Sequence, residues 1–371
     1  MNETLLTWIV FILAFGGMVI IHEFGHFIVA RLCKIEVEEF GIGLPTPGAI
    51  TLFTWQGTRF TLNWLPLGGF VRPKGENDPT VPGGLAAANP WRRFAVLVAG
   101  PLMNLFTAVV IYSFIFYRVG VPDVSRVLVN SVVANSPAEE AGFKGGDIFI
   151  SGNGKSIGSF DELRVIVDGN VDQPVTFLVE RDGEQIELIA TPQFFKDEKR
   201  TMIGVGLGVP FKQAGSMIET LNLGARYTYI NVRTLLSLPA QMIRGSLEPE
   251  QSRLIGLKGI FDIVGQTVSR DVEASANAAG ASASTDPIDQ PFRTLELIAS
   301  LSISLGIFNL FPFPALDGGR IIFLLPELLF RRRVPAQFEN LVHGLGMTAL
   351  LLFMIYVNVM DFVNPINITI P

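Results

Sequence analysis

The chain has 371 residues, enough for about two or three ordinary domains. Hydrophobic residues make up 49% and charged residues 17%, against about 25% charged residues in a typical soluble domain, which excludes a disordered chain. The net charge of −6 provides no overall basic field, so we expect no nucleic-acid partner. The single cysteine excludes an internal disulfide and a multi-cysteine zinc site.

Four apolar runs without charged residues predict four transmembrane helices, because about 20 such residues span the hydrocarbon core of a bilayer. The runs cover residues 5–21, 94–117, 297–316 and 344–360. The first continues past Glu23 without a small-residue cleavage site, so we expect it to be retained rather than removed as a signal peptide. Basic residues gather between the first and second runs and between the third and fourth. This distribution predicts that both termini and residues 118–293 lie outside the cytoplasm.

Two β-type runs occupy the loop between the first two spans, at residues 49–55 and 58–64. They predict a hairpin or small sheet on the cytoplasmic side. Its aromatic residues either dip into the lipid or belong to an ordinary solvated hairpin; they are Phe53, Trp55, Phe60 and Trp64.

The large outer region is predicted to have three parts. Residues 124–209 alternate short β-rich runs with turns, and Ser136 followed by Pro137 marks a helix start, so we expect a small α+β domain. Residues 216–270 show a partly amphipathic helical pattern. Residues 274–290 are rich in Ala, Ser, Gly and Asp and predict a linker.

The strongest chemical signal is the run from His22 through Glu23 to His26. Histidines four residues apart face the same side of a helix, so both imidazoles can reach one zinc ion. The glutamate between them can act on the attacking water. Because two histidines and a glutamate inside lipid are costly, the run indicates a functional site.

A hydrolytic zinc site normally takes a third protein ligand. We prefer Asp317, because Pro312 and Pro314 must break the third span just before it and an acidic residue at such a break indicates function. Two alternatives stay open. His343, at the start of the fourth span, is a candidate by residue type, and Asp317 can instead cap the helix that follows it.

These motifs resemble the site-2 protease family of intramembrane zinc metalloproteases, and within it the bacterial regulator-of-sigma-E protease subgroup. The resemblance covers residues 22–26, 66–71, 91–104 and 309–319, in order along the chain. The zinc ligands that it implies are His22, His26 and Asp317, and the implied catalytic base is Glu23. The implied substrate-binding residues lie near the scissile backbone or in the cytoplasmic β element, and are Asn309, Gly68 and Gly69.

The outer domain resembles a PDZ domain of bacterial proteases through residues 136–148 and 153–157. The implied peptide-binding loop covers residues 202–205, with Gly204 and Val205 as substrate-binding residues. The alternative is a steric gate that binds no peptide. One such domain is found, whereas the subgroup often carries two in tandem.

We therefore expect a polytopic α-helical membrane protein with four transmembrane helices, a cytoplasmic membrane-associated β-hairpin or sheet, and an extracytoplasmic α+β PDZ domain. The predicted segments are 1–33 (first helix with the zinc motif), 34–93 (cytoplasmic loop with the β element), 94–118 (second helix), 119–211 (PDZ domain), 212–273 (amphipathic helical region), 274–291 (linker), 292–330 (third helix, broken before Asp317), 331–342 (cytoplasmic loop), 343–363 (fourth helix) and 364–371 (outer tail).

The family resemblance implies a zinc endopeptidase of the bacterial plasma (inner) membrane that cleaves transmembrane segments of single-span proteins. Its partners would be the lipid bilayer and substrates already shortened outside, such as anti-sigma factors or remnant signal peptides. Two other classes of function would require different residues. A metal transporter needs polar residues along several spans, and the second and fourth offer little beyond Asn104 and His343. A catalytically silent scaffold, holding partners through the PDZ domain, does not need Glu23 between the histidines.

Overall fold

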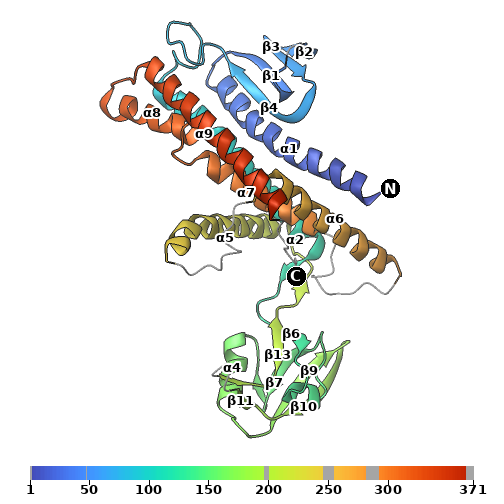
Figure 1. Cartoon of the computed structure of the whole chain (residues 1–371). Helices are drawn as coiled ribbons and strands as arrows, with labels where there is room; N and C mark the ends of the chain where they lie inside the picture. The colour runs from blue at the N-terminus through green and yellow to red at the C-terminus, as the bar shows by residue number, and fades with distance from the viewer. Residues whose placement is uncertain (1, 47, 196–199, 245–254, 281–291, 365–371) are drawn as a thin grey trace. The chain divides into compact units, whose positions relative to one another are not determined.

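The computed structural model describes the chain except for residues 1, 47, 196–199, 245–254, 281–291 and 365–371. The described residues form two compact units, and Figure 1 labels most of their longer elements. Of the described residues, the larger unit contains those up to Ile115 and those from Leu221 onward, and the smaller unit is Phe116–Thr220. Residues predicted as the outer tail lie mostly outside the described part of the chain.

Among the helices of the described residues, three are long and apolar enough to cross a membrane. They are α1 (Glu3–Leu32), α2 (Pro90–Val119) and α9 (Ala336–Val363), and they contain the first, second and fourth predicted spans. Each extends beyond its apolar run, because polar residues at a helix end continue the same backbone hydrogen bonding. The prediction of a loop over 331–342 was therefore wrong from residue 336 onward.

The third predicted span is divided into two helices, α7 (Arg293–Asn309) and α8 (Asp317–Phe330). Pro312 and Pro314 lie between them, and neither has an N–H group to continue the helical hydrogen bonds. The predicted break is confirmed. With 17 residues, α7 is shorter than the roughly 20 residues that cross a bilayer, so the count of four spans stays a prediction.

A four-stranded sheet follows α1 in the larger unit. Its strands are β1 (Val37–Leu44), β2 (Ile50–Trp55), β3 (Thr58–Leu62) and β4 (Leu65–Pro73), in the order β2-β3-β1-β4. The predicted hairpin is confirmed as β2 and β3, while β1 runs parallel to β3 and antiparallel to β4. The edge strand β4 packs on α1 (Figure 1). Phe53, Trp55 and Trp64 are exposed, and Phe60 stacks on Phe53.

The smaller unit confirms the predicted α+β domain. Its main sheet has the order β10-β9-β7-β6-β13, with β8 paired to β7. The strands are β6 (Val127–Val132), β7 (Ile148–Gly152), β8 (Lys155–Ser156), β9 (Val175–Arg181), β10 (Glu184–Ala190) and β13 (Val205–Gly208). Two short pairs join β5 (Val121–Pro122) to β14 (Phe211–Lys212) and β11 (Gln193–Phe195) to β12 (Arg200–Met202). The helices are α3 (Pro137–Glu140) and α4 (Phe160–Asp168).

A buried ion pair supports the core of this domain. The Asp147 side chain is fully buried and accepts two hydrogen bonds from Arg181, at 2.6 Å from Nε and 2.8 Å from Nη2. These hydrogen bonds raise the pKa of the Arg181 guanidinium above its usual value. The hydrophobic core of the same domain includes the aromatic rings of Phe143, Phe149 and Phe177, which contact one another.

Two helices follow the last strand of the smaller unit in the chain, α5 (Met217–Ile243) and α6 (Leu257–Gly280). In the larger unit, α6 contacts α1, α7 and α9. The Asp361 carboxylate of α9 accepts hydrogen bonds from the N–H groups of Gly256 and Gly259 at the start of α6. The prediction that the linker starts at residue 274 was wrong: α6 continues to Gly280, because alanine-rich sequence favours helix propagation. Residues 281–291 of that linker lie outside the described residues.

Candidate metal centre

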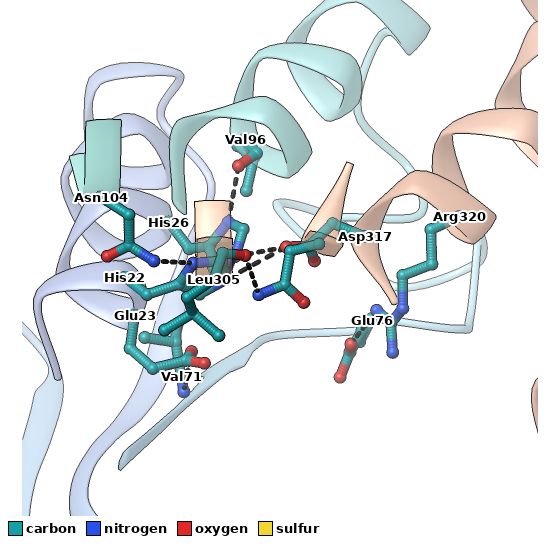
Figure 2. A network of polar contacts seen from close by, with 11 residues as sticks. His22, Glu23, His26, Val71, Glu76, Val96, Asn104, Leu305, Asp317 and Arg320 are labelled. Atoms are coloured by element: carbon teal, nitrogen blue, oxygen red, sulfur yellow. Dashed lines mark hydrogen bonds and ion pairs between the residues drawn. The ribbon is translucent and has the colours of Figure 1, made fainter. Parts of the chain in front are cut away.

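Three potential metal ligands converge between α1 and α8. His22 and His26 lie one turn apart on the same face of α1, and their Nε2 atoms are 3.1 Å apart. Oδ2 of Asp317, the first residue of α8, lies 3.1 Å from Nε2 of His22 and 3.4 Å from Nε2 of His26. Figure 2 shows the three side chains pointing toward one another. The structure therefore brings together the three residues predicted as ligands.

The break before α8 directs the Asp317 side chain. Ala315 adopts a left-handed conformation with φ of 80°, and its N–H donates to Nδ1 of His343 at 2.9 Å. A Cβ atom on Gly318 or Gly319 would collide with backbone carbonyls of residues 310–313, so the turn requires glycine at both positions. The N-cap position of α8 is held by Leu316, and Asp317 is the first residue inside the helix. Its carboxylate faces the imidazoles, which disfavours the capping alternative.

The spacing of the three atoms fits a zinc ion. In a tetrahedral site with bonds of about 2.0–2.2 Å, ligand atoms lie about 3.3 Å from one another. The three observed separations of 3.1, 3.1 and 3.4 Å match that value. Imidazole nitrogen and carboxylate oxygen are also the donor types that zinc accepts. Among the described residues, the group of possible metal ligands contains His22, His26 and Asp317 and does not contain His343.

Helix α2 contacts the outer nitrogens of both rings. Nδ1 of His26 donates to the carbonyl of Val96 at 2.7 Å, and Nδ1 of His22 lies 3.2 Å from Nδ2 of Asn104. The Gly100 backbone of α2 lies directly against the rings, since a Cβ atom there would be 2.8 Å from Nε2 of His22. Helix α2 therefore forms one wall of the site.

Glu23 is on the same helix as the histidines but is not one of the three converging residues. Its Oε2 accepts a hydrogen bond from the backbone N–H of Val71 in β4, at 3.0 Å. Beside it, a Cβ atom on Gly69 would lie 3.0 Å from the carbonyl oxygen of Gly41 and 3.7 Å from Cγ of Glu23. The preceding Gly68 has φ of 90°. Strand β4 therefore lies next to Glu23, as Figure 2 shows for Val71.

For the other predicted substrate-binding residues, the described part of the chain gives no contact with the three potential metal ligands. Asn309 ends α7, and its Nδ2 donates to the Leu305 carbonyl of the same helix at 2.9 Å. Gly204 and Val205 belong to the smaller unit, where Gly204 has φ of 88° and its carbonyl accepts from Val133 N–H. Their roles in substrate binding stay predictions.

Polar contacts hold α8 and the segment just after it against the start of α2 and the loop that precedes α2. The contacts are Arg93 with Glu327 at 2.7 Å, Arg320 with Glu76, and Arg333 with the Ala86 carbonyl at 2.9 Å. The first pair is mostly buried, where a low dielectric strengthens the attraction between the charges. These contacts fix the helix that carries Asp317.

Sequence reasoning assigned no role to Val96, Gly100 or Asn104. All three lie in the 91–104 block on which the family resemblance partly rests. The block itself was therefore a signal, but the pattern of an apolar helix does not show which of its residues face a partner helix.

Comparisons with known proteins agree with this geometry. The sequence model described as Peptidase family M50 matches residues 10–353. Metalloprotease MmpA from Caulobacter vibrioides is 30% identical over 374 residues, which cover 91% of each chain. A Clostridium perfringens protein named as a zinc metalloprotease is 31% identical over 356 residues, covering 96% of this chain and 98% of its own.

One solved structure aligns with part of the chain. The PDZ domain of an SdrC-like protein from Listeria monocytogenes aligns with a TM-score of 0.21 and 20% identity, covering 22% of this chain and 85% of its own. A TM-score this low does not establish the fold, so the PDZ assignment stays a prediction. The family match covers most of the chain and includes all three converging side chains. The chain therefore belongs to peptidase family M50, and the predicted zinc-dependent peptidase of the site-2 protease type is confirmed.

Proposed function

We propose that this protein is an intramembrane endopeptidase that cleaves transmembrane segments of single-span membrane proteins, with zinc held by His22, His26 and Asp317. The observation that carries the proposal is the convergence of these three side chains between an apolar helix able to span a membrane and a helix that begins at a proline-rich break. A metal at this place would reach peptide bonds that soluble proteases do not.

Zinc and the Glu23 side chain have separate roles in the proposed reaction. When bound, zinc supplies Lewis acidity, which polarises the scissile carbonyl and makes water a stronger nucleophile near neutral pH. The Glu23 carboxylate accepts a proton from the attacking water and passes it to the leaving nitrogen. Val71 N–H holds one oxygen of that carboxylate, and the second oxygen is available for the proton.

A helical substrate must first be unwound, because its amides are already hydrogen-bonded. In our proposal the unwound segment adds to the outer edge of β4, the last strand in the sheet order, beside Gly68 and Gly69, and Asn309 binds its backbone. The position of β4 as an edge strand packed on α1 supports this arrangement. Gly204 and Val205 would bind the outer end of the substrate.

The proposed orientation follows the basic residues. The sheet and the break before α8 would lie near the cytoplasmic face of the bacterial plasma membrane, and both termini and the smaller unit would lie outside. The partners would be the bilayer and single-span proteins already shortened outside, such as anti-sigma factors or remnant signal peptides.

Cleavage of a single-span reporter by the purified full-length protein in detergent tests the proposal. We expect the wild type to cut within the reporter's transmembrane segment, to stop when zinc is chelated, and to recover when zinc is restored. Glu23→Gln should keep its zinc and lose cleavage, because glutamine cannot exchange the proton. Glu3→Gln, at the other end of the same helix, is the matched control and should cleave normally.

Two outcomes would contradict the proposal. Cleavage by Glu23→Gln at the wild-type rate would remove Glu23 from the reaction. Wild-type protein that binds partners but cuts no reporter, with or without zinc, would favour the scaffold.

A further inference from the structure

Asn104 lies at the centre of the packing between α1, α2 and α7. Its side chain is 0% exposed, and its backbone carbonyl accepts a hydrogen bond from Oγ of Ser302 in α7 at 2.9 Å. The carboxamide extends from α2 toward α1, where one end lies 3.2 Å from Nδ1 of His22 (Figure 2). The backbone of Asn104 is thus fixed by one helix while its side chain contacts another.

His26 shows what a metal-binding imidazole needs on its outer side. A backbone carbonyl only accepts hydrogen bonds, so Nδ1 of His26 carries the proton that it donates to Val96. A neutral imidazole has one N–H, and Nε2 of His26 is therefore left with its lone pair facing the other ligands. This tautomer is the one that binds a metal through Nε2.

His22 has the same requirement, with a carboxamide in place of a carbonyl. To bind zinc through Nε2, its Nδ1 must carry a proton and needs an acceptor. The NH₂ end of Asn104 faces Nδ1, and Oδ1 is buried without a hydrogen-bond partner among the described residues. The two ends of a carboxamide have the same shape, so a half-turn of the amide exchanges them. In either orientation of the Asn104 carboxamide, one end faces His22 and the other end has no partner. The number of hydrogen bonds is therefore the same in both, and metal binding at His22 decides which orientation is favoured.

We propose that Asn104 is a positioning residue that controls which nitrogen of His22 is free to bind the metal. With zinc bound, Oδ1 of Asn104 accepts the Nδ1 proton of His22. Without zinc, the amide turns, its NH₂ donates to Nδ1, and Nε2 of His22 carries the proton and donates to Asp317, 3.1 Å away. The inference rests on the proposed zinc site and adds a residue that acts on it through His22.

Zinc affinity of the full-length protein, measured by competition with a chelator, tests the inference. Asn104→Leu keeps a similar volume without an acceptor, and we expect zinc affinity to fall about 10- to 100-fold, as for other lost partners of metal-binding histidines. Asn104→Asp keeps an acceptor and should bind zinc at least as tightly as the wild type. Thr107→Val removes a hydrogen-bonding hydroxyl from the same helix and should bind normally.

A spectroscopic measurement separates positioning from packing. Because the chain has three histidines, ¹⁵N-histidine labelling gives few ring N–H signals, and two should depend on zinc. Asn104→Leu should move the signal of His22 and leave that of His26, whose acceptor is Val96. A general loosening of α2 would move both signals.

The inference is overturned if Asn104→Leu binds zinc as the wild type does, or if Asn104→Asp is weakened as much as Asn104→Leu. The second result would assign Asn104 a packing role. Wild-type protein that binds no zinc would instead overturn the proposed function, so the two failures are distinguishable.

Discussion

Replacing Gly100 with alanine would place a methyl group against the rings of His22 and His26, the two histidines proposed to hold zinc. The added carbon would lie closest to Nε2 of His26, and it would also lie 2.7 Å from Cε1 of the same ring and 2.8 Å from Nε2 of His22. Ordinary contacts of this kind are about 3.5 Å, so both rings are too close to the added carbon, and the His22 ring would have to move by roughly 0.7 Å and the His26 ring by more. Zinc sites tolerate about 0.2 Å in their bond lengths. We expect Gly100→Ala to lower zinc affinity by more than about 100-fold, beyond the effect of losing an outer partner.

The matched control is Gly17→Ala on α1, because a Cβ atom at Gly17 meets no atom within 4 Å. Both variants would be purified in detergent, and zinc content and affinity measured by elemental analysis and chelator competition. Thermal unfolding in excess chelator compares the metal-free forms, so a general loss of folding is distinguished from a loss of metal. If Gly100→Ala binds zinc as tightly as Gly17→Ala, α2 does not pack against the imidazoles as described.

Three further substitutions test separate parts of the structure. Asp317→Ala should lose most of its zinc, since one of three ligands is removed, and unchanged zinc content would exclude Asp317 as a ligand. His343→Ala should keep its zinc, because its ring accepts from Ala315 N–H instead of facing the other ligands; loss of zinc would contradict this. Arg181→Ala leaves the Asp147 carboxylate buried without its partner, which costs about 3 kcal/mol. Hydrogen exchange in β7 and β9 should then be about 100-fold faster, and unchanged exchange would contradict the role of the pair.

The chemistry of the site was predictable because its signals are local. The positions of His22 and His26 on one face follow from helical periodicity alone. The break before Asp317 follows from two prolines that cannot donate hydrogen bonds. Joining these two segments, far apart in the chain, needed the rule that a hydrolytic zinc site takes a third ligand.

Features that depend on long-range packing were not predictable. Strand β1 lies between β3 and β4 in the sheet. The alternation of apolar and polar residues within one strand does not show which strands are its neighbours. The extension of α6 to Gly280 depends on how alanine-rich sequence continues an existing helix, and composition alone favoured a linker. Asn104 contacts His22 because two apolar helices cross at Gly100, and an apolar run does not encode its crossing point.

Close helix packing explains why small residues cluster near the site. A Cβ atom on Gly25 of α1 would lie 2.5 Å from the carbonyl oxygen of Ala99 in α2. On α7, a Cβ atom at Gly306 would lie 2.9 Å from the carbonyl oxygen of Pro101. Glycines at these crossings let the backbones approach, as small residues do in other membrane helix pairs. The short distance between α1 and α2 is what allows backbone and carboxamide groups of α2 to reach the outer nitrogens of both rings.

X-ray absorption at the zinc edge, recorded on the zinc-loaded Glu23→Gln protein, tests the central claim most directly. The account predicts two imidazole nitrogens and oxygen ligands at about 2.0–2.2 Å, and loss of this signal in protein that also carries Asp317→Ala. A sulfur neighbour at about 2.3 Å, or a spectrum without two imidazoles, would contradict it.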